Sequence, residues 1–132
     1  MTPQQAYEFT LLLIAIWREA RGEPLIAKLG VGWVIRNRVL HPSWWGASWP
    51  GVILQPFQFS SFNHNDPNAT KIPLDSDPAF EDCLNAAGGA YFDKSNDPTG
   101  GATSYYSTDI APPSWTKEMT FTVQLGALRF YR

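Results

Sequence analysis

Residues 7–24 read YEFTLLLIAIWREARGEP, and this stretch decides how the fold begins. Between residues 9 and 17 nearly every side chain is apolar, so a helix here would be apolar on almost all of its faces. Upstream, Thr2 can serve as an N-cap, with Pro3 at the first helical position and Gln5 completing a capping box. The sequence therefore predicts a buried helix that begins at about Pro3.

The end of this helix is marked by two residues that interrupt helical structure. Gly22 can adopt the left-handed conformation common after a helix, and Pro24 disfavours helical geometry at the residue before it. The helix is thus predicted to end near Ala20 or Arg21. Glu19 then lies in the last helical turn.

A second helix is predicted from Pro24 to about Leu40, with Pro42 just beyond its end. Two glycines within it, Gly30 and Gly32, each cost roughly 1 kcal/mol of helix propensity. A helix tolerates such residues where another element comes close to its backbone. We therefore expect another helix to pack against this one at the glycines.

The remaining chain combines a long irregular connection with one helix and two short strands. The connection, residues 41–78, is rich in Pro, Asn, Ser and Trp, and segments of this kind usually carry function. A third helix is predicted from about 77 to the glycines at 88 and 89, a turn over 97–101, and strands over 103–106 and 121–125. This order predicts an α+β fold, mainly helical with a small antiparallel sheet.

The composition limits the chemistry that the chain can perform. The 132 residues suffice for one domain, and Cys83 is the only cysteine, so no disulfide can form within the chain. With only His41 and His64 beside it, no Cys/His zinc spacing exists, and neither a metal nor an organic cofactor is expected. Cys83 lies on an apolar helical stripe, which favours a place in the core over a nucleophilic role.

Charge and hydropathy argue against nucleic acid and against membrane insertion. The net charge is −2 and the ten basic residues are scattered, which does not make a nucleic-acid surface. The N-terminus lacks a basic region typical of an export signal, and the apolar run 11–17 is far shorter than a bilayer span. We expect a monomer made in the cytoplasm without a visible signal peptide.

Glu19 is the strongest candidate for a catalytic acid. It follows an apolar helix, so poor solvation is expected, and it lies near the negative end of the helix dipole. Both influences raise the pKa of a carboxyl, as a proton donor to a glycosidic oxygen requires near neutral pH. The alternative is an exposed carboxylate paired with Arg18 or Arg21.

Five motifs lie in order along the chain: Glu19–Pro24, Val31–Val39, Val52–Ser60, Asp97–Ala102 with Tyr105 and Tyr106, and Leu125–Tyr131. Together they resemble the SleB-type cell wall hydrolase family. The similarity runs from about Leu11 to Arg132 and is therefore far more specific than one short motif. Two departures from the family pattern are Arg18, where glycine is common, and Leu128, where histidine often occurs.

The resemblance implies a single catalytic domain over residues 1–132 with a lysozyme-like fold, acting on peptidoglycan as a lytic transglycosylase. Glu19 would protonate the leaving oxygen of the MurNAc-GlcNAc β-1,4 bond and then act as base, with formation of 1,6-anhydro-MurNAc. Arg18 bears on this role, because a guanidinium folded over Glu19 would lower its pKa.

The resemblance also suggests substrate-binding residues, each with a structural alternative. Glu23 could face the substrate or order the Gly22 turn, and Gln58 and Ser60 could bind sugar hydroxyls or cap a turn. Tyr105 and Tyr106 could orient Glu19, but neighbouring residues on a strand face opposite ways, so only one can do so.

Further polar and aromatic residues are candidates for structural or sugar-binding roles. Asn37 is expected to bond the turn after Glu19. Trp44, Trp45 and Trp49 could stack on sugar rings or pack in the core. A hydrolase would need a second carboxylate, and the candidates are Glu23, Asp66, Asp97 and Asp109.

Two other functions stay open at this point: a muramidase that cleaves the same bond with water, and a catalytically silent glycan-binding module. The absence of a visible signal peptide fits a phage-type endolysin, released to the bacterial wall by a membrane-permeabilising partner.

Overall fold

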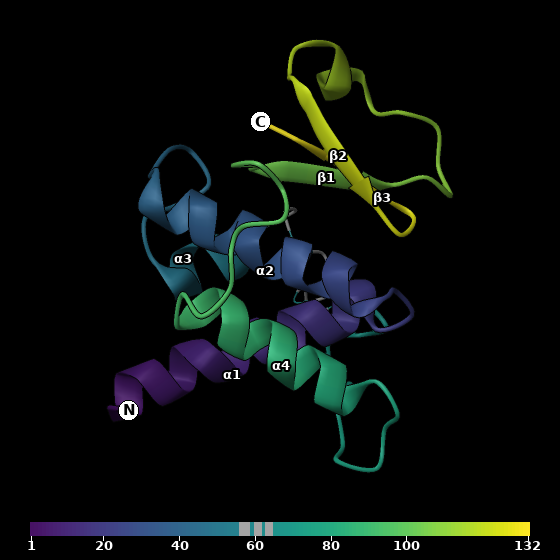
Figure 1. Ribbon diagram of the computed structural model, residues 1–132. Helices are drawn as coiled ribbons and strands as arrows, with labels where there is room; N and C mark the ends of the chain where they lie inside the picture. Colours follow the sequence, from purple (N-terminus) through teal and green to yellow (C-terminus); the bar gives the residue numbers. More distant parts are fainter. Residues whose placement is uncertain (56–58, 60–61, 63–64) are drawn as a thin grey trace.

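The computed structural model describes residues 1–55, 59, 62 and 65–132, and combines helices with a small antiparallel sheet (Figure 1). The predicted α+β class, mainly helical, is confirmed. The elements of the described residues are α1 (Pro3–Ala20), α2 (Leu25–Leu40), α3 (Trp49–Ile53), α4 (Phe80–Tyr91), β1 (Ser104–Ser107), the 3-10 helix η2 (Ser114–Lys117), β2 (Phe121–Leu125) and β3 (Leu128–Tyr131).

Helix α1 begins and ends where the sequence predicts. The Gln5 amide donates to Thr2 Oγ1 at 3.1 Å and the Thr2 amide donates to Gln5 Oε1 at 2.8 Å, which completes the capping box. The helix ends at Ala20. Burial is less extensive than the sequence suggested, because the first turns are exposed and only the C-terminal half, including Ile16 and Trp17, enters the core.

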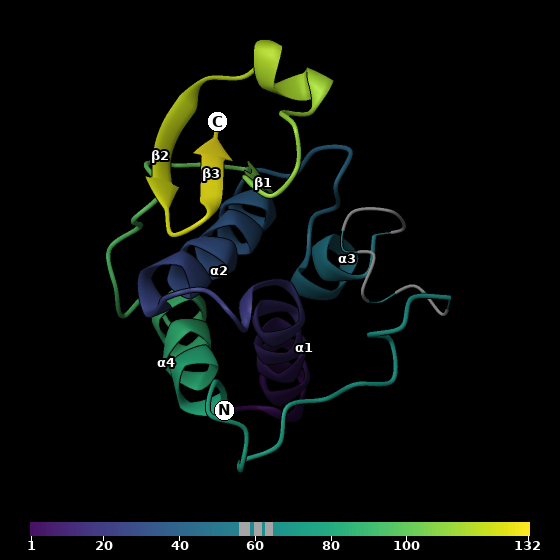
Figure 2. The ribbon, with the colours of Figure 1, turned by 90° about the vertical axis from the view of Figure 1, so that its right-hand side faces the viewer.

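Helix α2 lies between the other long helices and the sheet, as both views of the ribbon make clear (Figures 1 and 2). A Cβ added at Gly32 would lie 2.9 Å from the Ala90 Cβ of α4, so the expected close approach of a helix is confirmed there. At Gly30 the neighbour is the sheet, because an added Cβ would lie 2.7 Å from Phe130 Cζ. The two glycines thus let α4 and β3 pack on different sides of α2.

The sheet has the order β1-β3-β2 and is antiparallel throughout. The sequence patterns predicted β1 and β2 but not β3. A tight turn at Gly126, whose φ is +57°, connects β2 to β3. Tyr105 of β1 pairs with Phe130 of β3, and the Phe130 side chain is fully buried toward the helices. One face of the sheet therefore packs on α2.

Two helical details differ from the sequence-based expectations. Helix α3, at Trp49–Ile53, was not predicted; the Ser48 side chain caps it by accepting from the Gly51 amide at 3.0 Å. Helix α4 continues through Gly88 and Gly89 to Tyr91 instead of ending at the glycines. Close contact explains this continuation, since a Cβ added at Gly89 would lie 3.0 Å from Leu29 Cδ1.

Cys83 is fully buried in α4, as predicted for a core residue. Burial is the main cause that raises the pKa of its thiol to about 11, so it stays protonated. Within the described part of the chain, no helix combines the length and apolar character that crossing a bilayer needs.

The packing at α2 predicts opposite effects for two glycine-to-alanine changes. Gly32→Ala should lower the free energy of unfolding by about 1–3 kcal/mol, because the new methyl overlaps the Ala90 methyl. Gly88→Ala should raise it by about 0.5–1 kcal/mol, because nothing lies within 4 Å of its added Cβ and alanine favours helix. Urea unfolding of both variants checks this, and equal effects of the same sign would contradict the packing argument.

Candidate active site

Glu19 is the penultimate residue of α1 and is partly buried. Burial is the main cause that raises the pKa of its carboxyl to about 7, and the negative charge of Asp66 adds to the effect. The C-terminal end of a helix acts in the same direction, since its carbonyls disfavour an anion. A substantial fraction of Glu19 is therefore protonated at neutral pH.

Arg18 does not fold over Glu19. Its guanidinium donates to the Lys71 carbonyl at 2.9 Å from Nε and 2.7 Å from Nη2, and to the Ala69 carbonyl at 3.0 Å. It also lies 4.7 Å from the ring centre of Phe62. No Arg18–Glu19 ion pair occurs among the residues that the structure describes. Arg18, the departure from the family pattern, thus does not neutralise the Glu19 carboxyl.

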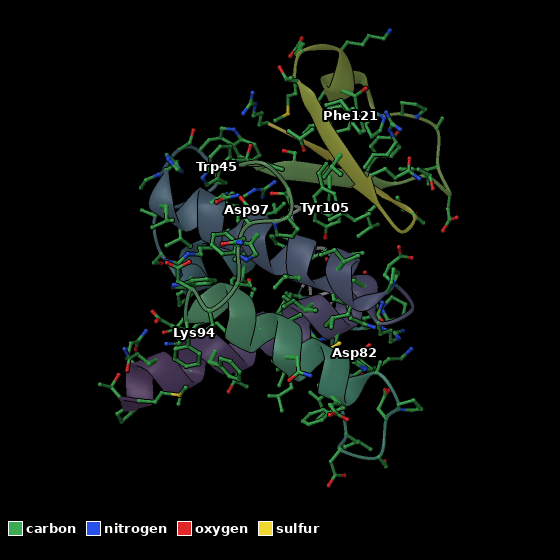
Figure 3. The ribbon with its side chains drawn as sticks, viewed as in Figure 1. Trp45, Asp82, Lys94, Asp97, Tyr105 and Phe121 are labelled. Atoms are coloured by element: carbon green, nitrogen blue, oxygen red, sulfur yellow. The ribbon has the colours of Figure 1, made fainter. Side chains whose placement is uncertain are left out.

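Tyr105 is the tyrosine of the pair that shares the surroundings of Glu19. Burial raises the pKa of its hydroxyl well above the ordinary value, the Glu19 charge raises it further, and Arg38 opposes both. The side chain lies between β1 and α2 (Figure 3). The Tyr105 hydroxyl therefore keeps its proton and can donate a hydrogen bond near Glu19.

Tyr106 lies on the opposite face of the sheet, away from Glu19. Its ring packs against Tyr131 at 6.0 Å and Trp115 at 6.2 Å between centroids. Phe121 completes this cluster, 5.6 Å from Tyr131, and lies on the side of the sheet away from the helices (Figure 3). The alternation expected for neighbouring strand residues thus separates the two tyrosines, and Tyr106 contributes packing.

Arg38 is a buried cation at the site that the sequence analysis did not single out. Its Nε donates to the Thr103 carbonyl at 2.6 Å, and its guanidinium lies 5.4 Å from the ring centre of Trp45 and 5.7 Å from that of Phe59. Burial is the main cause that lowers its pKa, and Tyr105 opposes this effect. The available signal was an arginine late in a helix whose other positions are mostly apolar.

Asn37 fastens the segment that leads into β1, and not the turn after Glu19 as expected. Its Nδ2 donates to Asp97 Oδ2 and to the Ala102 carbonyl, both at 2.9 Å. Asp97 also accepts from the Thr99 amide at 2.8 Å and from the Gly101 amide at 3.0 Å. This network sets the start of the strand that carries Tyr105.

Burial alone would raise the pKa of the Asp97 carboxyl, but hydrogen bonds from Thr99, Asn37 and Gly101 outweigh it. The pKa of Asp97 therefore lies below its ordinary value of 3.8. Asp97 is thus a structural anion and not a second catalytic carboxylate.

Glu23 connects the turn after α1 with the β2–β3 turn. Its Oε1 accepts from the Ala127 amide at 2.7 Å, and its backbone carbonyl accepts from Lys28 Nζ at 2.7 Å. The two turns are so close that Gly126 has no room for a side chain, since an added Cβ would lie 2.9 Å from Pro24 Cδ. The structure thus supports the architectural alternative for Glu23.

The other predicted sugar contacts are less closely tied to Glu19. Gln58 and Ser60 lie outside the described residues. Trp44 is 64% exposed, whereas Trp45 is partly buried and donates from Nε1 to the Arg38 carbonyl at 3.0 Å. Trp49 packs against Tyr91 at 4.9 Å between ring centroids.

The remaining candidates for a second carboxylate are Asp66 and Asp109. Asp66 is the carboxylate whose charge acts on Glu19, and Asp109 is exposed after β1. Within the described ranges, no three His, Cys, Asp or Glu side chains are grouped as metal ligands. The arrangement supplies one carboxyl poised to give a proton, with a phenol beside it.

The Asp97 network predicts a stability effect that depends on pH. A carboxyl with a lowered pKa stabilises the fold above its unfolded value, and this stability is lost as the pH falls through the folded value. Asp97→Asn should therefore lower the free energy of unfolding by about 1–3 kcal/mol near pH 7. The difference from wild type should shrink below about pH 4.

Urea unfolding at several pH values checks this, with exposed Asp109→Asn as the matched control that should match wild type at each pH. A loss that stays constant down to low pH would show that the charge of Asp97 is not its source.

A family model described as cell wall hydrolase matches residues 22–131 of the chain, a range that begins after Glu19. Two relatives are spore cortex-lytic enzymes. The one from Halalkalibacterium halodurans is 32% identical over 108 residues, 82% of this chain and 29% of the relative. The one from Bacillus cereus is 31% identical over 112 residues, 82% of this chain and 38% of the relative. The chain thus spans about a third of the length of these relatives.

Two solved structures extend the likeness across Glu19. The catalytic domain of the germination-specific lytic transglycosylase SleB from Bacillus anthracis has a TM-score of 0.74 and 27% identity, covering 99% of this chain and 97% of that one. The catalytic domain of the Bacillus cereus SleB protein has a TM-score of 0.71 and 28% identity, covering 100% and 93%. By sequence and by fold, the chain belongs to the SleB-type family of cell wall hydrolases.

Proposed function

We propose that this chain is a peptidoglycan lytic transglycosylase that cleaves the MurNAc-GlcNAc β-1,4 bond, with Glu19 as general acid and then base. The observation that carries the proposal is the carboxyl of Glu19, whose pKa burial raises to about 7 at the end of α1. The names of the SleB relatives, which refer to lytic transglycosylase and cortex-lytic activity, support the substrate class.

In the first step, protonated Glu19 gives its proton to the glycosidic oxygen that links MurNAc C1 to GlcNAc. The C1–O bond breaks, the GlcNAc end leaves as an alcohol, and positive charge develops at C1. Glu19 becomes a carboxylate in this step. A carboxyl with a pKa near the working pH is suited to both giving and accepting a proton.

In the second step, the C6 hydroxyl of the same MurNAc attacks C1 and transfers its proton to the Glu19 carboxylate. This forms the 1,6-anhydro ring and regenerates the acid without consuming water. One carboxyl therefore performs both proton transfers. The Tyr105 hydroxyl, which stays protonated, can donate a hydrogen bond to the Glu19 carboxylate or to the substrate between the two steps.

A muramidase is the second candidate, and the presence of Asp66 near Glu19 favours it. An inverting hydrolase needs a carboxylate that activates water, and Asp66 is the carboxylate whose charge acts on Glu19. Glu23 and Asp97 are poorer choices, because both accept backbone hydrogen bonds. Transglycosylation remains our proposal because it needs no second carboxylate.

Glu19→Gln should lower the rate of sacculus lysis by about 100-fold or more, because the amide cannot donate a catalytic proton. Binding to sacculi in a pull-down should persist, since the change preserves shape. Exposed Glu118→Gln is the matched control and should lyse like wild type. Equal lysis by Glu19→Gln would defeat the assignment, and the absence of lysis by wild type would favour the glycan-binding module.

Mass spectrometry of the soluble products distinguishes the two enzymes. Products ending in 1,6-anhydro-MurNAc are expected, whereas reducing MurNAc ends would support the muramidase.

The pH dependence should follow the protonation of Glu19. Because the acid form must be present, kcat/KM for glycan cleavage should be constant well below pH 7 and fall about tenfold per unit well above it. Initial rates on solubilised glycan strands between pH 4 and 9 check this. A fall centred near 4.5, the ordinary value for glutamic acid, would mean that Glu19 is not the proton donor.

A further inference from the structure

The last turn of α1 holds the segment that carries Asp66. Arg18 donates to the carbonyls of Ala69 and Lys71, as described above, and Arg21 Nη2 donates to Asn68 Oδ1 at 3.4 Å. Three residues of the segment, Asn68, Ala69 and Lys71, thus accept hydrogen bonds from the two arginines that flank Glu19 in the sequence. Residues 66–71 therefore lie against the end of α1.

Asp66 is built into the same segment by local hydrogen bonds. Its Oδ1 accepts from the Asn68 amide at 2.8 Å, and its carbonyl accepts from the Ala69 amide at 3.0 Å. The Asp66 carboxylate therefore has a defined position relative to the Ala69 carbonyl that Arg18 binds. By binding the Ala69 carbonyl, Arg18 therefore also holds Asp66 against the end of α1.

The charge of Arg18 is directed to the segment and not to Glu19. Its guanidinium is occupied by the two carbonyls and by the ring of Phe62, and Asp66 is the anion that acts on it. Among the described residues, the charged or titratable groups that act on Glu19 are Asp66, from the segment, and Tyr105, from β1, with Arg38 of α2 acting on Tyr105. The negative charge of Asp66, which acts on Glu19, thus lies on a segment that Arg18 binds.

We propose that Arg18 is a positioning residue: by binding the Ala69 and Lys71 carbonyls it holds residues 66–71, and with them the Asp66 carboxylate, against the end of α1 that carries Glu19. Asp66 acts through its charge and not as a base toward water. This rests on the proposed role of Glu19 as the proton donor. It assigns a function to the arginine that departs from the family pattern.

The direction in which the pKa of Glu19 shifts in Arg18→Ala tests the role of Arg18. If Arg18 acted on Glu19 as a nearby positive charge, Arg18→Ala would raise the pKa of Glu19. If Arg18 positions Asp66, Arg18→Ala should lower it, as should Asp66→Asn, by at least about half a unit. Asn can keep the hydrogen bond to the Asn68 amide, so Asp66→Asn changes charge with little change in structure.

The pKa of Glu19 is measured by NMR titration of its side-chain carboxyl carbon in protein labelled at glutamate. The Glu19 signal is identified as the one that is missing from the spectrum of Glu19→Gln. Rates of glycan cleavage against pH accompany it. Both single variants should move the alkaline fall of kcat/KM to lower pH, a roughly threefold loss above pH 8 for half a unit, and leave the rate at acidic pH near wild type. The double variant should shift no further than Asp66→Asn.

Two matched controls remove comparable groups elsewhere. Arg36→Ala removes an arginine of α2 that donates to the carbonyls of Ala90 and Tyr91 of α4, at 3.2 and 3.1 Å. Asp75→Asn removes an exposed carboxylate further along the same connection. Neither should shift the titration of Glu19.

An upward shift in Arg18→Ala, or no shift in Asp66→Asn, would overturn the inference. Loss of cleavage at every pH in Asp66→Asn would also overturn it, and would indicate that Asp66 is the base of a muramidase. If Arg18→Ala fails to fold, the pKa of Glu19 in Asp66→Asn and in Arg18→Lys still tests the inference. The titration needs no activity, so a wild type that cleaves nothing would defeat the proposed function without deciding this one.

Discussion

The close packing of α2 against elements on both of its sides is the constraint on which the rest of the structure depends. At Gly32 the helix backbone approaches α4, and at Gly30 it approaches Phe130 of the sheet. Either contact would be lost if a side chain stood at these positions, because interiors are close-packed and adjust little. The separation between the helices and the sheet, and thus the surroundings of Glu19, follows from this packing.

The same helix carries the polar groups that position β1. Asn37 binds Asp97 and the Ala102 carbonyl, while Arg38 binds the Thr103 carbonyl. Each buried polar group is therefore satisfied by the chain segment that leads to Tyr105, as burial requires. The Tyr105 phenol shares the surroundings of Glu19, although it comes from a strand far along the sequence, because two adjacent residues of α2 fix where that strand begins.

The pKa of Glu19 depends on where the guanidinium groups of the neighbouring arginines bind. Arg18 and Arg21 are the cations closest in sequence, yet Arg18 donates to backbone carbonyls and Arg21 lies over Trp17, 4.5 Å from its ring centre. An adjacent cation neutralises a carboxyl only when its donors point toward it. The raised pKa of Glu19 thus comes from burial and Asp66 together with the different orientation of both arginines.

Local patterns determined the elements whose signals are local, and tertiary contacts decided the rest. The capping residues and the Gly22–Pro24 break predicted both ends of α1, and hence the place of Glu19, because helix ends depend on nearby backbone groups. The sequence also indicated that only one of Tyr105 and Tyr106 could face Glu19, since strand side chains alternate. It could not say which one, nor that Asn37 reaches Asp97, nor that Arg18 turns to the Lys71 carbonyl. The last two outcomes join residues 60 and 53 positions apart, and only the folded chain brings their donors and acceptors within bonding distance.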